Sequence, residues 1–234
     1  MTRCSRTGIG LFSMKPKGNK VARPNPIEFS LYLISDRQAL PKGRHLLTAV
    51  EQALLGGVGA VQLRDKDLPD DERLMLARQL RTLTRRYRAQ LLINGSVDIA
   101  LASEADGVHL GASSLSVVEA RHLLGPERLI GYSAHSLEEL AQVAEMGADF
   151  ATFSPIFFTP SKAAYGPPQG LERLIAACSA SPIPIFALGG IDLSRIATIR
   201  QAGAQGVAVI SAILASSEPC LAAQTLNTAL TKNE

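Results

Sequence analysis

The sequence has no tryptophan, and aromatic residues make up only 5% of its 234 residues. Surfaces that stack nucleic-acid bases depend on aromatic side chains, so this scarcity argues against a nucleic-acid-binding protein. No apolar run reaches the roughly 20 residues that a helix needs to cross a membrane, and no secretory signal pattern is present. We therefore expect neither a nucleic acid nor a membrane as a partner.

Cysteine is also scarce. The three cysteines, Cys4, Cys178 and Cys220, lie too far apart to form a metal-binding or redox motif. An odd number of cysteines without a secretory signal is typical of a reducing compartment, which predicts a cytoplasmic protein.

Acidic residues are missing from the first 23 residues, which hold six basic ones. Without that segment the chain has 18 basic and 21 acidic residues, so the formal net charge of +3 does not reflect a basic binding face on the body of the protein. We expect residues 1–28 to form a disordered basic leader and residues 29–234 to form one domain.

Eight short apolar runs alternate with eight helical patterns along the rest of the chain. The runs are continuously apolar, as expected for parallel strands that are buried on both faces. They cover residues 30–35, 60–63, 91–93, 107–110, 129–133, 150–154, 184–188 and 206–210. This alternation predicts an α/β protein, a single-domain (β/α)8 TIM barrel. A doubly wound open sheet is the alternative, but the chain has no GxGxxG fingerprint.

Small residues follow the last two expected strands. Gly189 and Gly190 end the seventh strand, and Ile210 and Ser211 end the eighth. In barrels, backbone N–H groups at these two strand ends commonly bind phosphate, although a Gly-Gly pair can also be a simple tight turn. We predict that these four residues form a phosphate site.

The second expected strand ends in a cluster of polar residues. Alternation places Gln62, Arg64 and Lys66 on one side of the chain. Two cations and an amide that converge in this way suit an anion such as pyrophosphate. The sequence leaves open the alternative that these cations form a solvated cluster paired to Asp65 or Asp67.

A long loop, residues 155–170, follows the sixth expected strand. Thr159, Ser161 and Lys162 supply two hydroxyls and a cation that suit phosphate. The length of the loop favours a lid over a plain connection.

Two histidines lie near the predicted site. His135 follows the fifth strand, just before a helix start marked by Ser136 and Glu139. A histidine at this rim suits a general acid or base, and an ordinary loop residue is an equal alternative. His109 lies inside the fourth strand and is expected to be a core residue.

Taken together, these residues resemble the superfamily of thiamine phosphate synthase and thiazole tautomerase. The matching motifs are VQLRDK (61–66), ADGVHLG (105–111), GYSAHSLEE (131–139), the TPSK loop, ALGGI (187–191) and GAQGVAVISAI (203–213). The resemblance implies a barrel that acts on a phosphorylated thiazole in thiamine biosynthesis. It also adds Asn94 and Ser133 to the residues expected to bind substrate or pyrophosphate.

Two loops distinguish the branches of this superfamily. In the synthase, aspartates in the patterns NDR and GQxD hold the Mg²⁺ that carries the pyrophosphate leaving group. Gly95 and Ser114 stand at the corresponding positions here, and neither supplies the anionic oxygen that Mg²⁺ prefers. The run NGSVDIA (94–100) resembles the tautomerase pattern NGRVDIA instead. We therefore expect no metal site and no cofactor, with Mg²⁺ required only if the chain is a synthase.

These patterns lead us to expect a metal-independent thiazole tautomerase, in which His135 moves a proton while Thr159 and Lys162 close over the substrate. The first alternative is a thiamine phosphate synthase, which joins an aminopyrimidine diphosphate to a thiazole phosphate and releases pyrophosphate. The second is a non-catalytic regulator that binds a phosphorylated ligand. The expected partner is a small phosphorylated thiazole. The sequence also leaves open that the chain forms a homodimer.

Overall fold

The computed structural model describes residues 27–159 and 167–231 of the chain. Eight parallel strands form a closed barrel in sequence order, and β1 pairs with both β2 and β8. The strands are β1 (Leu31–Ile34), β2 (Ala60–Leu63), β3 (Gln90–Asn94), β4 (Gly107–Leu110), β5 (Leu129–Ala134), β6 (Phe150–Phe153), β7 (Ile185–Leu188) and β8 (Gly206–Val209). The predicted (β/α)8 barrel is confirmed.

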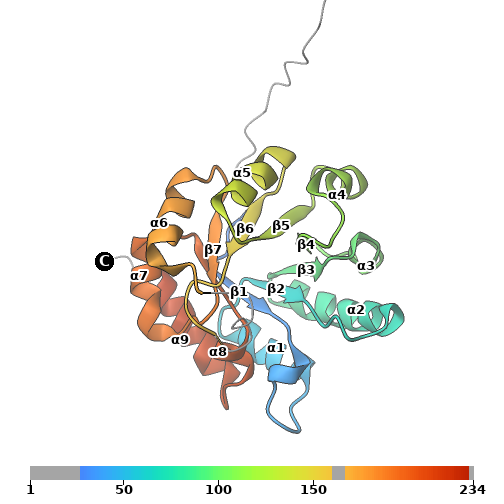
Figure 1. Cartoon of the computed structure of the whole chain (residues 1–234). Coiled ribbons are helices and arrows are strands. Elements are labelled where there is room, and N and C mark those ends of the chain that lie inside the picture. Colours follow the sequence, from blue (N-terminus) through green and yellow to red (C-terminus); the bar gives the residue numbers. More distant parts are fainter. Residues whose placement is uncertain (1–26, 160–166, 232–234) are drawn as a thin grey trace, which may run out of the picture.

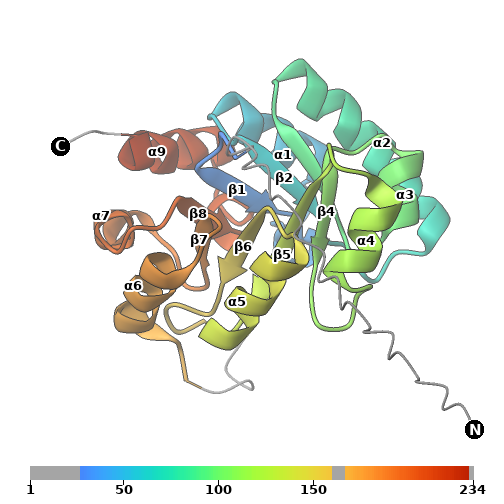
Figure 2. The same cartoon turned by 90° about the horizontal axis from the view of Figure 1, so that it is seen from above.

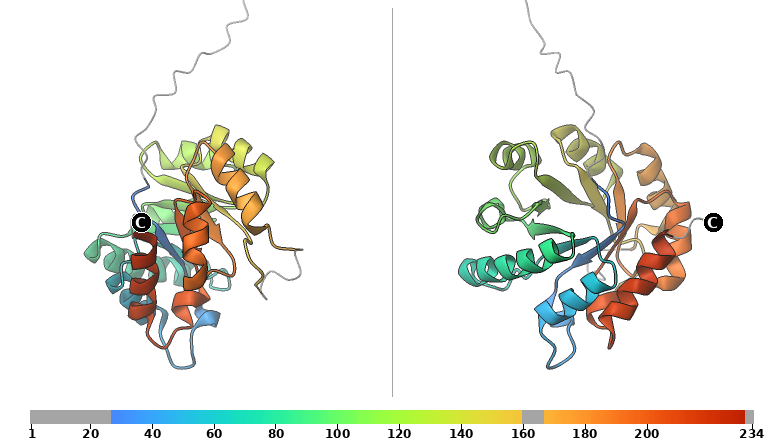
Figure 3. Two further views of the ribbon diagram at one scale, coloured as in Figure 1. Left: turned by 90° about the vertical axis from the view of Figure 1, so that its left-hand side faces the viewer. Right: turned by 180° about the vertical axis from the view of Figure 1, so that it is seen from behind.

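Helices surround the strands (Figure 1). They are α1 (Leu46–Leu55), α2 (Asp70–Arg86), α3 (Val97–Ala102), α4 (Val117–Leu124), α5 (Leu137–Met146), α6 (Gly170–Ala180), α7 (Ile196–Gln201), α8 (Ser211–Leu214) and α9 (Pro219–Thr231), with 3-10 turns η1 (Arg37–Ala39) and η3 (Leu193–Arg195). The sequence pattern did not separate the short α8. Helices α1 and α9 pack side by side and close the ring (Figure 3).

Strand alternation divides the buried residues into two layers, because successive side chains point to opposite faces of the sheet. Leu33 and Val61 belong to the layer between the strands and the outer helices, whose ribbons Figure 2 shows in a second view. Tyr32, Phe150 and Phe186 fill the inside of the barrel, where the Phe150 and Phe186 ring centroids lie 5.5 Å apart. The barrel is thus a packed core, and a ligand has room only at its ends.

The inner aromatic layer should contribute strongly to stability. Phe150 is 0% exposed and contacts the rings of Phe29, Tyr32 and Phe186. We expect Phe150→Ala to lower the free energy of unfolding by about 3–5 kcal/mol, because it leaves a cavity in this core. The matched control is Phe158→Ala, since Phe158 is 67% exposed and should change stability by less than about 0.5 kcal/mol. Urea unfolding curves of both variants measure the difference, and equal midpoints would contradict it.

The expected leader, residues 1–28, lies outside the described residues except for its last two. Within the part of the chain that the structure describes, none of the helices combines the length and apolarity required to cross a membrane.

Candidate active site

The predicted site residues gather at one end of the barrel. Those that the structure describes lie at the carboxyl ends of strands or just after them, where (β/α)8 enzymes build their active sites. They are Gln62, Arg64, Lys66, Asn94, Ser133, His135, Thr159, Gly189, Gly190, Ile210 and Ser211. Ser161 and Lys162 fall outside the described residues.

The two acidic residues beside Arg64 and Lys66 form ion pairs with a different arginine, Arg37. Asp65 is buried, and its carboxylate accepts hydrogen bonds from the backbone N–H of Arg37 at 2.9 Å and from the Arg37 Nε at 3.2 Å. The carboxylate of Asp67 pairs with Arg37 Nη2 at 2.7 Å. The sequence allowed Asp65 and Asp67 to pair with Arg64 and Lys66. In the structure both acids pair with Arg37.

Arg64 and Lys66 are therefore not paired with these two acids and are available to bind an anionic ligand. Arg64 is half-buried and Lys66 is exposed. Within residues 27–159 and 167–231, no carboxylate forms an ion pair with either side chain. Ser35 fixes the backbone here, because its Oγ accepts from the Arg64 N–H at 2.8 Å and donates to Asp65 at 2.5 Å. This arrangement favours an anion site over a solvated charge cluster.

The Gly189–Gly190 turn adopts a backbone that other residues rarely take. Its φ angles are +101° and +64°. A Cβ on Gly189 would lie 2.8 Å from Pro155 Cβ, and one on Gly190 would lie 2.6 Å from the carbonyl oxygen of Phe158. Only glycine fits this close approach of the β6–α6 loop, and the bare backbone can approach an anion.

Arg195 holds the same turn in place, and sequence reasoning missed it. Its guanidinium donates a hydrogen bond to the carbonyl of Gly190 and lies 4.4 Å from the centroid of the Phe157 ring. The Phe157 N–H in turn donates to the Gly189 carbonyl at 3.1 Å. Arg195 thus ties the glycine turn to the start of the β6–α6 loop. An arginine five residues after a Gly-Gly pair was the available signal.

Ile210 and Ser211 end the neighbouring strand, since β7 pairs with β8. Ile210 precedes α8 and Ser211 opens it, with Ser211 exposed. The four residues predicted to bind phosphate thus belong to two adjacent strand ends.

His135 lies at the rim, as predicted, and is exposed. Its Nδ1 is 2.8 Å from the carbonyl oxygen of Ser154, so Nδ1 carries the proton that donates to this acceptor. Ser136 caps α5 by accepting from the Glu139 N–H at 3.1 Å. The Glu139 carboxylate accepts from the backbone N–H of His135 at 2.7 Å.

His109 lies inside the barrel and is 1% exposed, which agrees with its expected core position. Its ring nitrogens contact the hydroxyls of Tyr32 (3.3 Å) and Ser133 (3.0 Å). Burial lowers the pKa of His109 to about 3, and the charge of Arg64 adds to the effect. This imidazole is therefore neutral at physiological pH.

The loops after β3 and β4 meet, but their donors do not fit Mg²⁺. A Cβ built on Gly95 would lie 3.5 Å from Ser114 Oγ, which accepts from the Gly111 N–H at 3.2 Å. Neither residue supplies the anionic oxygen that Mg²⁺ prefers. Among the described residues, no group of three or more His, Cys, Asp or Glu side chains could hold a metal ion.

Restoring carboxylates at this junction should create a metal site. Gly95 has φ +72°, a conformation that aspartate and asparagine adopt more readily than most residues. We expect Gly95→Asp with Ser114→Asp to bind Mg²⁺ at least about tenfold more tightly than the neutral control, Gly95→Asn with Ser114→Asn. Calorimetric titration with MgCl₂ measures both variants. Equal affinities would mean that the two positions do not form a joint site.

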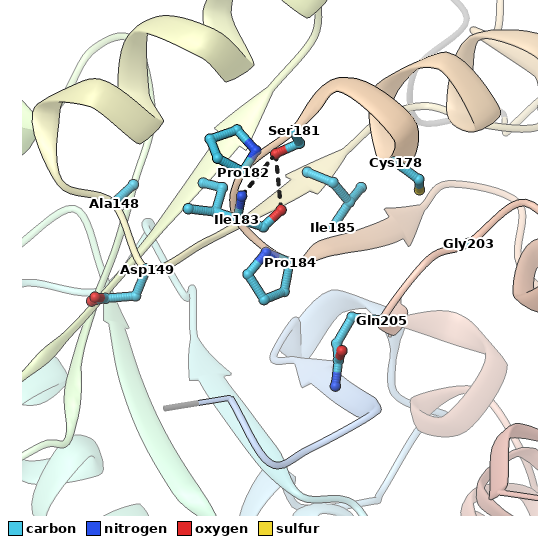
Figure 4. A pocket seen from close by; sticks show the side chains of 10 residues that line it. All are labelled: Ala148, Asp149, Cys178, Ser181, Pro182, Ile183, Pro184, Ile185, Gly203 and Gln205. Carbon is cyan, nitrogen blue, oxygen red and sulfur yellow. Dashed lines mark hydrogen bonds between the residues drawn. The ribbon is translucent and has the colours of Figure 1, made fainter. Parts of the chain in front are cut away.

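A depression of about 470 Å³ lies at the other end of the barrel (Figure 4). Its lining comes mostly from the segments that precede β6, β7 and β8, including Asp149, Ser181 and Gln205. The Asp149 carboxylate is already paired with Arg121 at 2.6 Å. Because barrel enzymes place their chemistry at the carboxyl ends of the strands, this depression is not the candidate active site.

Comparisons with known proteins identify relatives of the chain. A Geobacter sulfurreducens protein that carries the provisional name thiamine-phosphate synthase is 54% identical over 193 residues, which are 82% of this chain and 90% of that protein. The thiamine-phosphate synthase of Syntrophomonas wolfei is 45% identical over 82% of this chain and 91% of its own length. In relatives from Synechocystis and Synechococcus the match covers only 57% and 55% of the longer protein.

A solved structure agrees with these relatives. Thiamine phosphate pyrophosphorylase from Pyrococcus furiosus matches with a TM-score of 0.78 and 34% identity, over 86% of this chain and 95% of that protein.

The expectation of a thiazole tautomerase is wrong. Relatives that are 40–54% identical are named thiamine-phosphate synthase, and the acid–base role of His135 loses the reaction on which it rested. Only two loop positions, Gly95 and Ser114, depart from the synthase pattern at the metal site. The family described as thiamine monophosphate synthase matches residues 31–213. The chain belongs to the thiamine monophosphate synthase family.

Proposed function

We propose that this chain is a thiamine-phosphate synthase, which joins an aminopyrimidine diphosphate to a thiazole phosphate and releases pyrophosphate. The names of its relatives support this transferase reaction. The observation that carries it is the pair of cations, Arg64 and Lys66, whose acidic neighbours are bound to Arg37. A reaction with a diphosphate leaving group needs such a pair, and a proton transfer within one thiazole does not.

The strand order supports two anion sites that face each other across β1. Arg64 and Lys66 follow β2, and the Gly189–Gly190 turn and Ser211 follow β7 and β8. Because β1 pairs with both β2 and β8, only β1 separates β2 from β8, and β7 lies one strand further along the barrel. We assign the diphosphate to the β2 side and the phosphate of the thiazole to the β7–β8 side, so that both substrates meet over the mouth of the barrel.

The chemical step is a displacement. The bond between the pyrimidine's methylene carbon and the diphosphate oxygen breaks, the electron pair leaves with the diphosphate, and the thiazole nitrogen forms the new bond to that carbon. Arg64 and Lys66 stabilise the negative charge that develops on the diphosphate leaving group. Such electrostatic stabilisation is usually the largest single contribution to catalysis. Asn94, Ser133, Thr159, Ser161 and Lys162 are the further polar residues that we assign to substrate binding.

The proposed mechanism does not assign a step to Mg²⁺. The resemblance to the synthase implies Mg²⁺, but Gly95 and Ser114 offer no carboxylate for it. The charge of the leaving group therefore rests on the side chains of this protein.

Separate binding of two anions tests the proposal. In calorimetry, inorganic pyrophosphate should bind to protein that is already saturated with thiazole phosphate, because the two ligands occupy different strand ends. Arg64→Met should abolish pyrophosphate binding and leave thiazole phosphate binding within about twofold of wild type. Competition between the two ligands for a single site would contradict the proposal.

A further inference from the structure

A continuous chain of hydrogen bonds crosses the inside of the barrel and ends at the site. It runs from Asn94 through Gln62, Tyr32 and His109 to Ser133. Tyr32, Gln62 and His109 are at most 1% exposed, whereas Asn94 and Ser133 are half-buried. The proposed reaction uses the two ends of this chain and gives Tyr32 and His109 no role.

One fixed acceptor sets the direction of every bond in this chain. The Asn94 side chain lies 3.4 Å from the backbone carbonyl of His109, which can only accept, so the Asn94 atom that faces it is the donating amide nitrogen. The same nitrogen lies 3.3 Å from Gln62 Oε1, which therefore accepts. The other end of that amide, Gln62 Nε2, then donates to the Tyr32 hydroxyl at 2.8 Å.

The direction continues through His109. The Tyr32 hydroxyl accepts from Gln62, so its single proton is directed to His109 Nδ1 at 3.3 Å, since leaving a buried hydroxyl proton without an acceptor would cost about 1–3 kcal/mol. A neutral imidazole that accepts at Nδ1 carries its proton on Nε2. That nitrogen lies 3.0 Å from Ser133 Oγ and 3.5 Å from Thr152 Oγ1, so Ser133 is its nearer acceptor.

We propose that His109 is a positioning residue that holds the Ser133 hydroxyl as a hydrogen-bond donor toward an acceptor atom of the bound substrate. Because Ser133 Oγ accepts from His109, its own proton remains for a partner outside the chain. Ser133 stands at the carboxyl end of β5, and an acceptor in reach is an oxygen of an anionic substrate or a ring nitrogen. The kinetic part of this inference rests on the proposed function, whereas the state of His109 does not.

The tautomer of His109 tests the proposal without any catalysis. In ¹⁵N NMR of the whole protein, the His109 ring should show an unprotonated Nδ1 and a protonated Nε2, unchanged from pH 5 to pH 9. Comparison with a His109→Gln spectrum assigns these signals among the four histidines. Tyr32→Phe, which removes the donor to Nδ1, should shift the tautomer balance. A ring protonated on Nδ1, or one that titrates near pH 6.5, would overturn the proposal.

Kinetics of double variants separate positioning from a purely structural role. Ser133→Ala should lower kcat/KM for coupling by about 10- to 100-fold, the range for a lost hydrogen bond to a charged group. His109→Leu should cause a similar loss, and His109→Gln, which keeps a neutral donor, should recover part of it. Because His109 acts through Ser133, the double variant Ser133→Ala with His109→Leu should be no worse than Ser133→Ala alone.

Thr152→Val is the matched control, because it removes the weaker partner of the same nitrogen and should change kcat/KM by less than about threefold. Losses that multiply in the double variant would assign His109 a structural role and contradict the proposal. If His109→Leu does not fold, the same comparison uses His109→Gln with Ser133→Ala, and the tautomer measurement on the wild-type protein still decides.

Discussion

Replacing Arg64 with methionine is expected to lower kcat/KM for coupling by about 100- to 1000-fold, the loss typical of removing one preorganised charge stabiliser. The guanidinium forms no ion pair within the described part of the chain and lies half-buried at the mouth of the barrel, so it is available for the diphosphate. Arg64→Lys should recover only part of the activity, because an ammonium lacks the planar fork that binds two phosphate oxygens.

The matched control is Arg86→Met at the last residue of α2. The Arg86 side chain is 69% exposed and pairs with Glu51 far from the site residues, so its loss should leave coupling unchanged. Steady-state assays at several concentrations of the aminopyrimidine diphosphate measure both variants. If the Arg64 and Arg86 variants retain the same activity, Arg64 does not bind the leaving group.

Gly190→Ala is expected to weaken thiazole phosphate binding by about 100-fold. The added Cβ would lie 2.6 Å from the Phe158 carbonyl and 2.9 Å from Phe157 Cβ, in a backbone with φ +64°. Left-handed strain costs about 1–2 kcal/mol and overpacking about 1–3 kcal/mol, and both are relieved only by moving the turn or the β6–α6 loop. Either movement displaces the groups that we assign to the phosphate.

Gly170→Ala separates strain from displacement. Gly170 has a similar φ of +76°, but a Cβ there meets nothing within 4 Å. This control should lower thermal stability by the strain alone and leave the affinity for thiazole phosphate within about threefold of wild type. Calorimetric titration with thiazole phosphate compares the two alanine variants. Similar affinities would show that the glycine turn is not part of the phosphate site.

The fold could be predicted from the sequence because its signal is repeated eight times. Each strand is a mostly apolar and mostly buried run of four to six residues, and each is followed by a helical pattern. Errors at single boundaries therefore did not change the result. The short helix α8, for example, was not separated from α9.

The site could be predicted only where strand position decides the location of a residue. Arg64 and Gly190 follow their strands, and that position was enough to place them at the active end. The partner of Asp65 could not be read from the sequence, because Arg37 is 28 residues away and reaches it only through the pairing of β1 with β2. Contacts between distant segments, such as that of Tyr32 with His109, are fixed by the closure of the barrel and leave no local pattern.

The prediction of the tautomerase branch was wrong because a local pattern was misleading. Gly95 and Ser114 carry a clear local signal, since both positions lack a carboxylate, and this signal outweighed the rest of the chain. A missing metal ligand shows what a residue cannot hold, but it does not identify the reaction. Arg64 and Lys66 bear more directly on the proposed reaction, because its diphosphate leaving group needs cations.

The proposed function is tested most directly by supplying the purified full-length chain with aminopyrimidine diphosphate and thiazole phosphate, in buffer containing Mg²⁺, and quantifying both products. We predict equal amounts of thiamine phosphate and pyrophosphate, formed at a rate that falls in Arg64→Met and not in Arg86→Met. If both substrates bind but neither product forms, the chain is a ligand-binding protein without this activity, and the proposed synthase is contradicted.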